Sequence, residues 1–317
     1  MSQLSTLPGP DATASGPGDP VTPVVGRARE VELLVAALDS GAHVVLEGPP
    51  GTGKTTLLRA VAEEAHSAFV FVEGNAELTP ARLIGHFDPA QVLEHGYGPE
   101  TFVDGPLVEA LRLGALLYVE EVNRIPEETL NVLITVMSEG ELHVPRLGRV
   151  VAAREFRLVA AMNPFDAVGT ARISSAVYDR VCRITMGYQG ADDEAAIVDL
   201  KAPALDEEWR TRVVALVRGT REHADVRVGS SVRGAIDLTR LAVSLAHRRG
   251  VPTTDWHVGL DAALVALSGR IRLTESCTRS PEAVVRELYE AQFGAEPTPD
   301  TDDDTSDDEG GGAPGGA

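Results

Sequence analysis

The segment from Gly48 to Thr55 reads GPPGTGKT, a complete glycine-rich phosphate-binding loop. The apolar run from His43 to Leu46 precedes it, and a helix-like segment from Lys54 to His66 follows it. Such a loop constrains the fold strongly, because its glycines let backbone N–H groups turn toward phosphate oxygens and the following helix adds the positive end of its dipole. The pattern predicts a buried strand, a phosphate loop and a helix in succession.

The residue types in this loop indicate a nucleoside triphosphate bound together with Mg²⁺. Lys54 is expected to reach the β- and γ-phosphates, and the Thr55 hydroxyl is expected to ligate the cation. The residues predicted to hold the nucleotide here are Gly48, Pro49, Pro50, Gly51, Thr52, Gly53, Lys54, Thr55 and Thr56.

A second apolar run, GALLYVEE, ends in the acids Glu120 and Glu121. It reads as a buried parallel strand that delivers two carboxylates at its C-terminal edge, where nucleotide chemistry takes place in such sheets. Glu120 is placed to hold Mg²⁺ through its water shell, and Glu121 to orient and deprotonate the attacking water. The alternative is a pair of exposed acids that merely end a strand.

A third predicted strand, from Phe156 to Ala161, leads to Asn163. An Asn at this place could hold the attacking water or sense the γ-phosphate. An Asn before a Pro is by itself usually a turn former, so this assignment depends on the other motifs.

Taken together, these motifs resemble the AAA+ ATPases and, within them, the MoxR family, over roughly residues 24 to 275. The segment LLYVEEVNRIPEETLNVLITVMSEGELHV is similar to the family's strand-two acids, its Asn-Arg-x-Pro signature, a helix and a hairpin. The segment FRLVAAMNP resembles the strand that ends in the sensor-one residue, here Asn163. The resemblance implies ATP as the nucleotide, and it assigns Gly26, in Val-Gly-Arg, to a segment that packs on the adenine.

The same resemblance assigns two arginines. Arg180 occupies the family's position for an arginine finger, which would act on the γ-phosphate bound by a neighbouring subunit. Arg233 lies in a segment that resembles sensor two, although the usual Pro before the Arg is missing. A shared active site requires a homo-oligomer, and AAA+ rings are usually hexamers.

The predicted fold is an α/β parallel sheet of the AAA+ P-loop NTPase type, flanked by helices and followed by a small all-helical lid domain. We expect strands near 43–46, 69–72, 116–119, 157–161 and 181–185. The predicted domains are a disordered segment over 1–23, the nucleotide-binding domain over 24–190, the lid over 191–293 and a disordered acidic, Gly-rich tail over 294–317. The insertion at about 80–109 resembles the family's helix-two insert; it could touch a substrate in the ring pore or be a passive surface loop.

The net charge of −20 argues against a nucleic-acid or anionic-membrane surface. The two cysteines have no metal-ligand spacing, and no stretch approaches the length of an apolar membrane span. We therefore expect a cytoplasmic protein that binds no nucleic acid and has no membrane segment.

The sequence leaves three functions open. The resemblance implies a chaperone-like ATPase that remodels a protein client, together with a partner that carries a von Willebrand A domain. Glu120 stands where the family usually has Asp, and its extra methylene motivates an alternative, a slow or non-hydrolysing ATP-dependent scaffold or switch. A chelatase-like or gas-vesicle-assembly ATPase is the third possibility.

Overall fold

The computed structural model describes residues 24–164, 175–203 and 206–297. The N-terminal segment and most of the acidic tail, which the sequence predicts to be disordered, therefore lie outside the described residues. The start of the segment that leads to Arg180 also lies outside them. The contacts divide the chain into two compact units, one formed by residues up to Leu200 together with Ser231–Arg233, the other by the remaining C-terminal residues. The sequence had placed this boundary at 190. No helix in the described part of the chain is long and apolar enough to cross a membrane.

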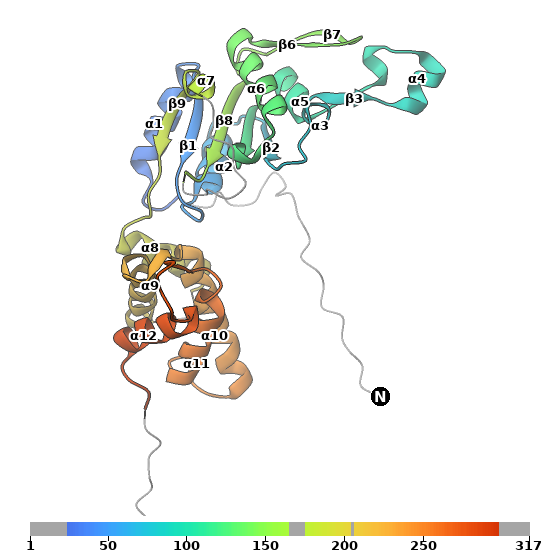
Figure 1. The fold of residues 1–317 in the computed structure, drawn as a ribbon. Coiled ribbons are helices and arrows are strands. Elements are labelled where there is room, and N and C mark those ends of the chain that lie inside the picture. Colours follow the sequence, from blue (N-terminus) through green and yellow to red (C-terminus); the bar gives the residue numbers. More distant parts are fainter. Residues whose placement is uncertain (1–23, 165–174, 204–205, 298–317) are drawn as a thin grey trace, which may run out of the picture. The chain divides into compact units, whose positions relative to one another are not determined.

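The first unit is built around a five-stranded parallel sheet with the strand order β2-β5-β8-β1-β9 (Figure 1). The expected α/β fold and all five expected strands are confirmed. The strands are β1 (His43–Glu47), β2 (Phe69–Glu73), β5 (Leu116–Glu120), β8 (Arg157–Met162) and β9 (Val181–Thr185).

Apolar side chains alternate between the two faces of this sheet. Successive strand residues point to opposite faces, so a sheet covered on both sides needs apolar residues at nearly every position. On one face, residues such as Leu117 and Val119 pack against α3 (Pro80–Ile84), α5 (Pro106–Leu113) and α6 (Glu127–Glu139). On the other face, Leu116, Tyr118 and their neighbours pack against α1 (Ala28–Asp39) and α2 (Lys54–Glu64).

The expected insertion forms a small antiparallel unit. Strands β3 (Gly85–Phe87) and β4 (Phe102–Asp104) pair, and between them lie α4 (Pro89–His95) and a single 3-10 turn. A second hairpin, β6 (Glu141–Val144) with β7 (Gly148–Val151), precedes β8. The two elements touch, because the Arg146 guanidinium lies 3.8 Å from the centre of the Tyr97 ring.

The second unit is helical, as expected, and also contains a short strand pair. Its helices are α9 (Glu207–Glu222), α11 (Trp256–Leu267), α12 (Pro281–Phe293) and most of α10 (Val232–Arg249), and β10 (Val226–Val228) pairs with β11 (Arg272–Leu273). α8 (Ala191–Lys201) groups almost entirely with the first unit.

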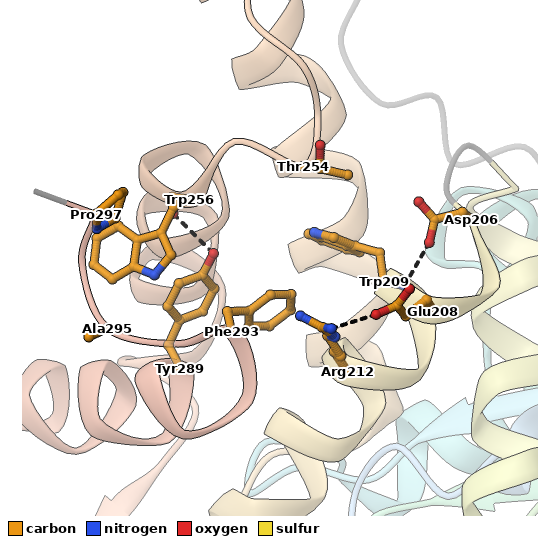
Figure 2. A pocket seen from close by; sticks show the side chains of 10 residues that line it. All are labelled: Asp206, Glu208, Trp209, Arg212, Thr254, Trp256, Tyr289, Phe293, Ala295 and Pro297. Carbon is orange, nitrogen blue, oxygen red and sulfur yellow. Dashed lines mark hydrogen bonds and ion pairs between the residues drawn. The ribbon is translucent and has the colours of Figure 1, made fainter. Parts of the chain in front are cut away.

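Aromatic residues join three of these helices. The rings of Tyr289 and Phe293 on α12 stack at 4.5 Å, Trp209 on α9 lies 5.7 Å from Phe293, and Trp256 on α11 lies 5.5 Å from Tyr289. A cavity of about 430 Å³ opens beside these rings (Figure 2). All of its lining residues belong to the second unit, and none is a predicted nucleotide-binding residue.

Candidate nucleotide-binding site

The phosphate loop lies between β1 and α2, as the sequence predicted. Gly51 and Gly53 adopt φ values of 76° and 85°, a left-handed conformation that favours glycine. The Thr52 hydroxyl donates to the Pro49 carbonyl at 3.0 Å, which closes the loop on itself. Because parallel strands end at one edge of the sheet, the loop meets the ends of β5 and β8; the Gly48 N–H donates to the Met162 carbonyl at 3.2 Å.

Lys54 is folded back over the loop. Its Nζ donates to the carbonyl oxygens of Gly48 and Pro49 at 2.8 and 2.9 Å, and the residue is 9% exposed. Burial lowers the pKa of Lys54 to about 8; Glu120 opposes this shift, and the nearby cations Arg233 and Arg27 add to it. The nearby carboxylates therefore do not offset the cost of burying the charged Lys54 amine. Bound phosphates would supply the missing negative charge.

Thr55 and Glu120 come together although they are far apart in the sequence. The Thr55 hydroxyl donates to Glu120 Oε1 at 3.1 Å, and the Tyr118 hydroxyl lies 3.2 Å from the same Thr55 oxygen. The two residues predicted to hold Mg²⁺ thus present oxygen ligands at one place, and oxygen is the ligand type that this cation prefers.

Glu121 directly follows β5 and has an unusual backbone. Its φ and ψ are 52° and 41°, in the left-handed region, which is uncommon for a residue with a side chain. Gly74 makes this turn possible: its N–H donates to the Glu120 carbonyl at 2.7 Å, and a Cβ on Gly74 would lie 2.5 Å from the Glu121 carbonyl oxygen. The Glu121 carboxylate pairs with Arg124 at 3.0 Å. Strained backbone of this kind is concentrated at functional sites.

Asn163 follows β8 at the same edge of the sheet and is half-buried. Nearby, the buried Glu47 at the end of β1 accepts a hydrogen bond from the Tyr178 hydroxyl and pairs with Arg183 at 3.4 Å. Neither contact of Glu47 was predicted from the sequence. An acid at the last position of an otherwise apolar strand was the available signal.

Arg180 lies two residues after the end of the short helix α7 (Ser175–Tyr178). Its Nη1 donates to the Ala176 carbonyl at 2.7 Å, and its Nε donates to the Ser138 hydroxyl of α6. The side chain is 33% exposed, so part of it remains accessible to a neighbouring molecule.

The two remaining predicted residues also lie in the first unit. Gly26 has a φ of 67°, and a Cβ there would collide with the Asp193 side chain of α8. Contacts group Arg233 with this unit as well. Arg27 was not predicted as a site residue. It is 4% exposed, and its Nη2 donates to the Thr52 carbonyl at 3.0 Å, so it holds the backbone of the phosphate loop in place.

A parallel sheet with a phosphate loop after β1 and two carboxylates at the C-terminal end of β5 defines a P-loop nucleotide-binding protein. The sequence model of the AAA domain (dynein-related subfamily) matches residues 43–181. Residues 43–181 are therefore similar to an AAA domain of the dynein-related, MoxR-like kind, in agreement with the resemblance stated from the motifs.

Curated relatives of similar sequence include two halophile proteins. The gas vesicle ATPase GvpN of Haloferax mediterranei is 31% identical over 234 residues, which cover 69% of this chain and 64% of that protein. GvpN1 of Halobacterium salinarum is 32% identical over 209 residues, covering 61% and 60%. The chain thus spans less than two thirds of the length of either protein. The uncharacterized protein YeaC of Bacillus subtilis is 28% identical, covering 71% of this chain and 77% of YeaC.

Among solved structures, a variant of Thermotoga maritima RuvB is similar, with a TM-score of 0.50 and 18% sequence identity. The match covers 76% of this chain and 71% of that chain. At this identity the likeness supports the AAA+ fold alone.

The lowered pKa of Lys54 predicts that nucleotide binding takes up a proton. In the free protein the amine loses its proton as the pH rises through about 8, whereas bound phosphates favour the charged form. Above about pH 8 the affinity for ADP should therefore fall by up to about tenfold per pH unit. Calorimetric titration with ADP at about pH 8.5, in buffers of different ionisation enthalpy, measures the uptake.

Lys54→Arg is the matched control, because arginine keeps its charge throughout this pH range. Its binding of ADP should take up no proton through this position. Binding to the unaltered protein that is independent of pH and of the buffer would contradict the prediction.

Proposed function

We propose that this chain is a MoxR-type ATPase that hydrolyses ATP with Mg²⁺ at the interfaces between copies of itself in a ring, and that uses the cycle to remodel a protein client. The observation that carries the proposal is the hydrogen bond from Thr55 to Glu120 beside Lys54, with Glu121 next along the chain. This combination supplies phosphate binding, cation binding and a candidate base at one edge of the sheet. The AAA domain match and the relatives named as ATPases support it.

Each residue has a distinct part in the proposed reaction. The loop N–H groups and Lys54 bind the phosphates, and Thr55 and Glu120 would hold Mg²⁺, which neutralises phosphate charge when bound. Glu121 takes a proton from the attacking water, and Asn163 orients that water. Arg180 of a neighbouring copy and Arg233 stabilise the charge that builds up on the γ-phosphate.

The donor set fits Mg²⁺ bound together with a nucleotide. Within the described ranges, no three His, Cys, Asp or Glu residues gather into a metal cluster. Mg²⁺ is commonly bound through one or two protein oxygens together with substrate phosphates, rather than by a cage of protein ligands alone. Thr55 and Glu120 are a ligand pair of this kind.

If sites are shared between copies, ATP turnover per subunit should rise with protein concentration. Dilution separates the copies and removes each Arg180 from the neighbouring site, so the specific activity should fall at low concentration and level off at high concentration. Phosphate release measured across a dilution series, alongside sedimentation to follow assembly, checks this. Constant specific activity across a range in which the protein changes from monomer to oligomer would contradict a shared site.

The alternative of a slow switch rests on Glu120. Glu120→Asp shortens the carboxylate by one methylene, or roughly 1.5 Å. Under the ATPase proposal this change alters the turnover number only a few-fold, because the Thr55–Glu120 pair is already formed. A sharp rise in turnover in Glu120→Asp would instead favour a protein that binds ATP and barely hydrolyses it.

Gas-vesicle assembly is a second candidate process, favoured by the similarity to GvpN proteins. In the more specific form of the first proposal, a protein with a von Willebrand A domain links the ATPase to its client. Adding a purified protein of either kind to the ATPase assay separates them, because a genuine partner should raise turnover in a saturable way. Stimulation by gas-vesicle structural protein, and none by a von Willebrand A domain, would select gas-vesicle assembly.

A further inference from the structure

Tyr118 is a fully buried residue of β5 whose single side-chain polar atom lies at the cation ligands. Its ring lies 6.0 Å from that of Phe69 and 5.7 Å from that of Phe71, both on β2. Residues two apart on a strand share a face, so Tyr118 lies on the same face as Glu120. This is the face covered by α2, the helix whose first turn carries Thr55.

The hydrogen bonds around Thr55 have one consistent direction. A hydroxyl has one hydrogen and two lone pairs. Thr55 donates its hydrogen to Glu120, so at 3.2 Å from Tyr118 it accepts the phenol hydrogen. A tyrosine hydroxyl has one hydrogen to donate and is protonated at neutral pH, so the phenol is the donor in this contact.

We propose that Tyr118 is a positioning residue for the cation site: by donating to Thr55 it locks the hydroxyl so that its one remaining lone pair has a fixed direction for Mg²⁺. This inference rests on the proposed function, because it concerns the same nucleotide site. The physical reason is the strict geometry of Mg²⁺, which requires near-ideal octahedral ligand directions and gains from a ligand that is already oriented. Without Tyr118, only the hydrogen bond to Glu120 orients the hydroxyl, and its lone pairs are held less firmly.

The test compares how much Mg²⁺ strengthens ADP binding in the wild-type protein and in Tyr118→Phe. Calorimetric titration with ADP, once with Mg²⁺ and once with a chelator, gives the ratio of the two affinities. In Tyr118→Phe we expect that ratio to fall about 3- to 10-fold, the range that corresponds to the loss of one hydrogen bond, while metal-free ADP binding stays unchanged. The Mg²⁺ concentration for half-maximal ATP turnover should rise by a similar factor.

Tyr289→Phe is the matched control. Tyr289 is also buried in an aromatic cluster, and its hydroxyl donates to the Trp256 carbonyl at 3.0 Å within the second unit. Both variants lose one buried phenol hydrogen bond and should lose similar thermal stability. Only Tyr118→Phe should change the effect of Mg²⁺ on ADP binding.

The outcomes separate this inference from the proposed function. An unchanged Mg²⁺ effect in Tyr118→Phe, or an equal loss in Tyr289→Phe, would overturn the positioning role and leave the ATPase proposal in place. A wild-type protein whose ADP binding does not respond to Mg²⁺ at all would overturn both.

Discussion

Replacing Glu121 with glutamine should lower ATP turnover about 10²- to 10⁴-fold and leave ATP bound, because the amide keeps the size of the side chain and cannot accept a proton from water. Glu121 is suited to this part by its place directly after β5 and by its left-handed backbone, for which Gly74 leaves room. Phosphate release and retention of ATP after gel filtration measure the two effects.

Two controls isolate the base from other effects of the substitution. Glu121→Gln also removes the ion pair with Arg124, so Arg124→Ala tests that loss alone and should retain turnover within a few-fold. Glu128→Gln changes an exposed acid in the first turn of α6 and should have no effect. Turnover that is unaltered in Glu121→Gln would eliminate the assigned mechanism.

Arg180→Ala should lower turnover by about 10³- to 10⁵-fold, the size of effect measured for arginine fingers. ATP binding to the same subunit should change little, because the phosphate loop and Lys54 are untouched. Arg180 now bonds to Ser138 and to the Ala176 carbonyl of its own chain, so thermal unfolding should be measured alongside turnover to reveal any structural loss.

Mixing inactive variants tests whether Arg180 acts in trans. A subunit with Arg180→Ala retains Glu121, and a neighbour with Glu121→Gln retains Arg180, so a site between them is complete. Random assembly of equal amounts should restore about a quarter of the wild-type rate if the sites are independent. In the control mixture, Glu121→Gln with Lys54→Ala, both changes lie on the nucleotide-binding side and activity should not return. A mixture of Arg180→Ala and Glu121→Gln that stays inactive would place the arginine in its own site or outside the mechanism.

The strands and the loop could be predicted because their signals are local. A parallel strand covered on both faces reads as a continuous apolar run, and the loop needs its glycines in consecutive positions. Each strand was located to within one residue; where β1, β2, β5 and β8 extend one residue further, the added residue is Glu47, Glu73, Glu120 or Met162. Three of these four residues are glutamates, and periodicity alone does not include a polar residue that ends a strand.

The roles of Asn163, Arg180 and Arg233 could not be predicted from local patterns in this way. No spacing in the chain distinguishes them from a turn residue or from surface cations, and they were selected by resemblance to a family. The described fold brings Asn163 to the edge of the sheet beside the phosphate loop, but it contains one copy of the chain, so the action of Arg180 on a neighbour stays a prediction.

By itself the sequence determined the α/β class, the position of the phosphate loop and the two carboxylates at the end of β5, because each depends on residues that are adjacent in the chain. Only the tertiary structure decided which distant residues contact the loop and the strand ends. Tyr118 bonds to Thr55, Arg27 donates to the Thr52 carbonyl, and Tyr178 donates to Glu47. These pairs are separated by between 25 and 131 residues and form where strands and helices pack. Contacts of this kind follow from the three-dimensional register of whole elements, which no local sequence pattern encodes.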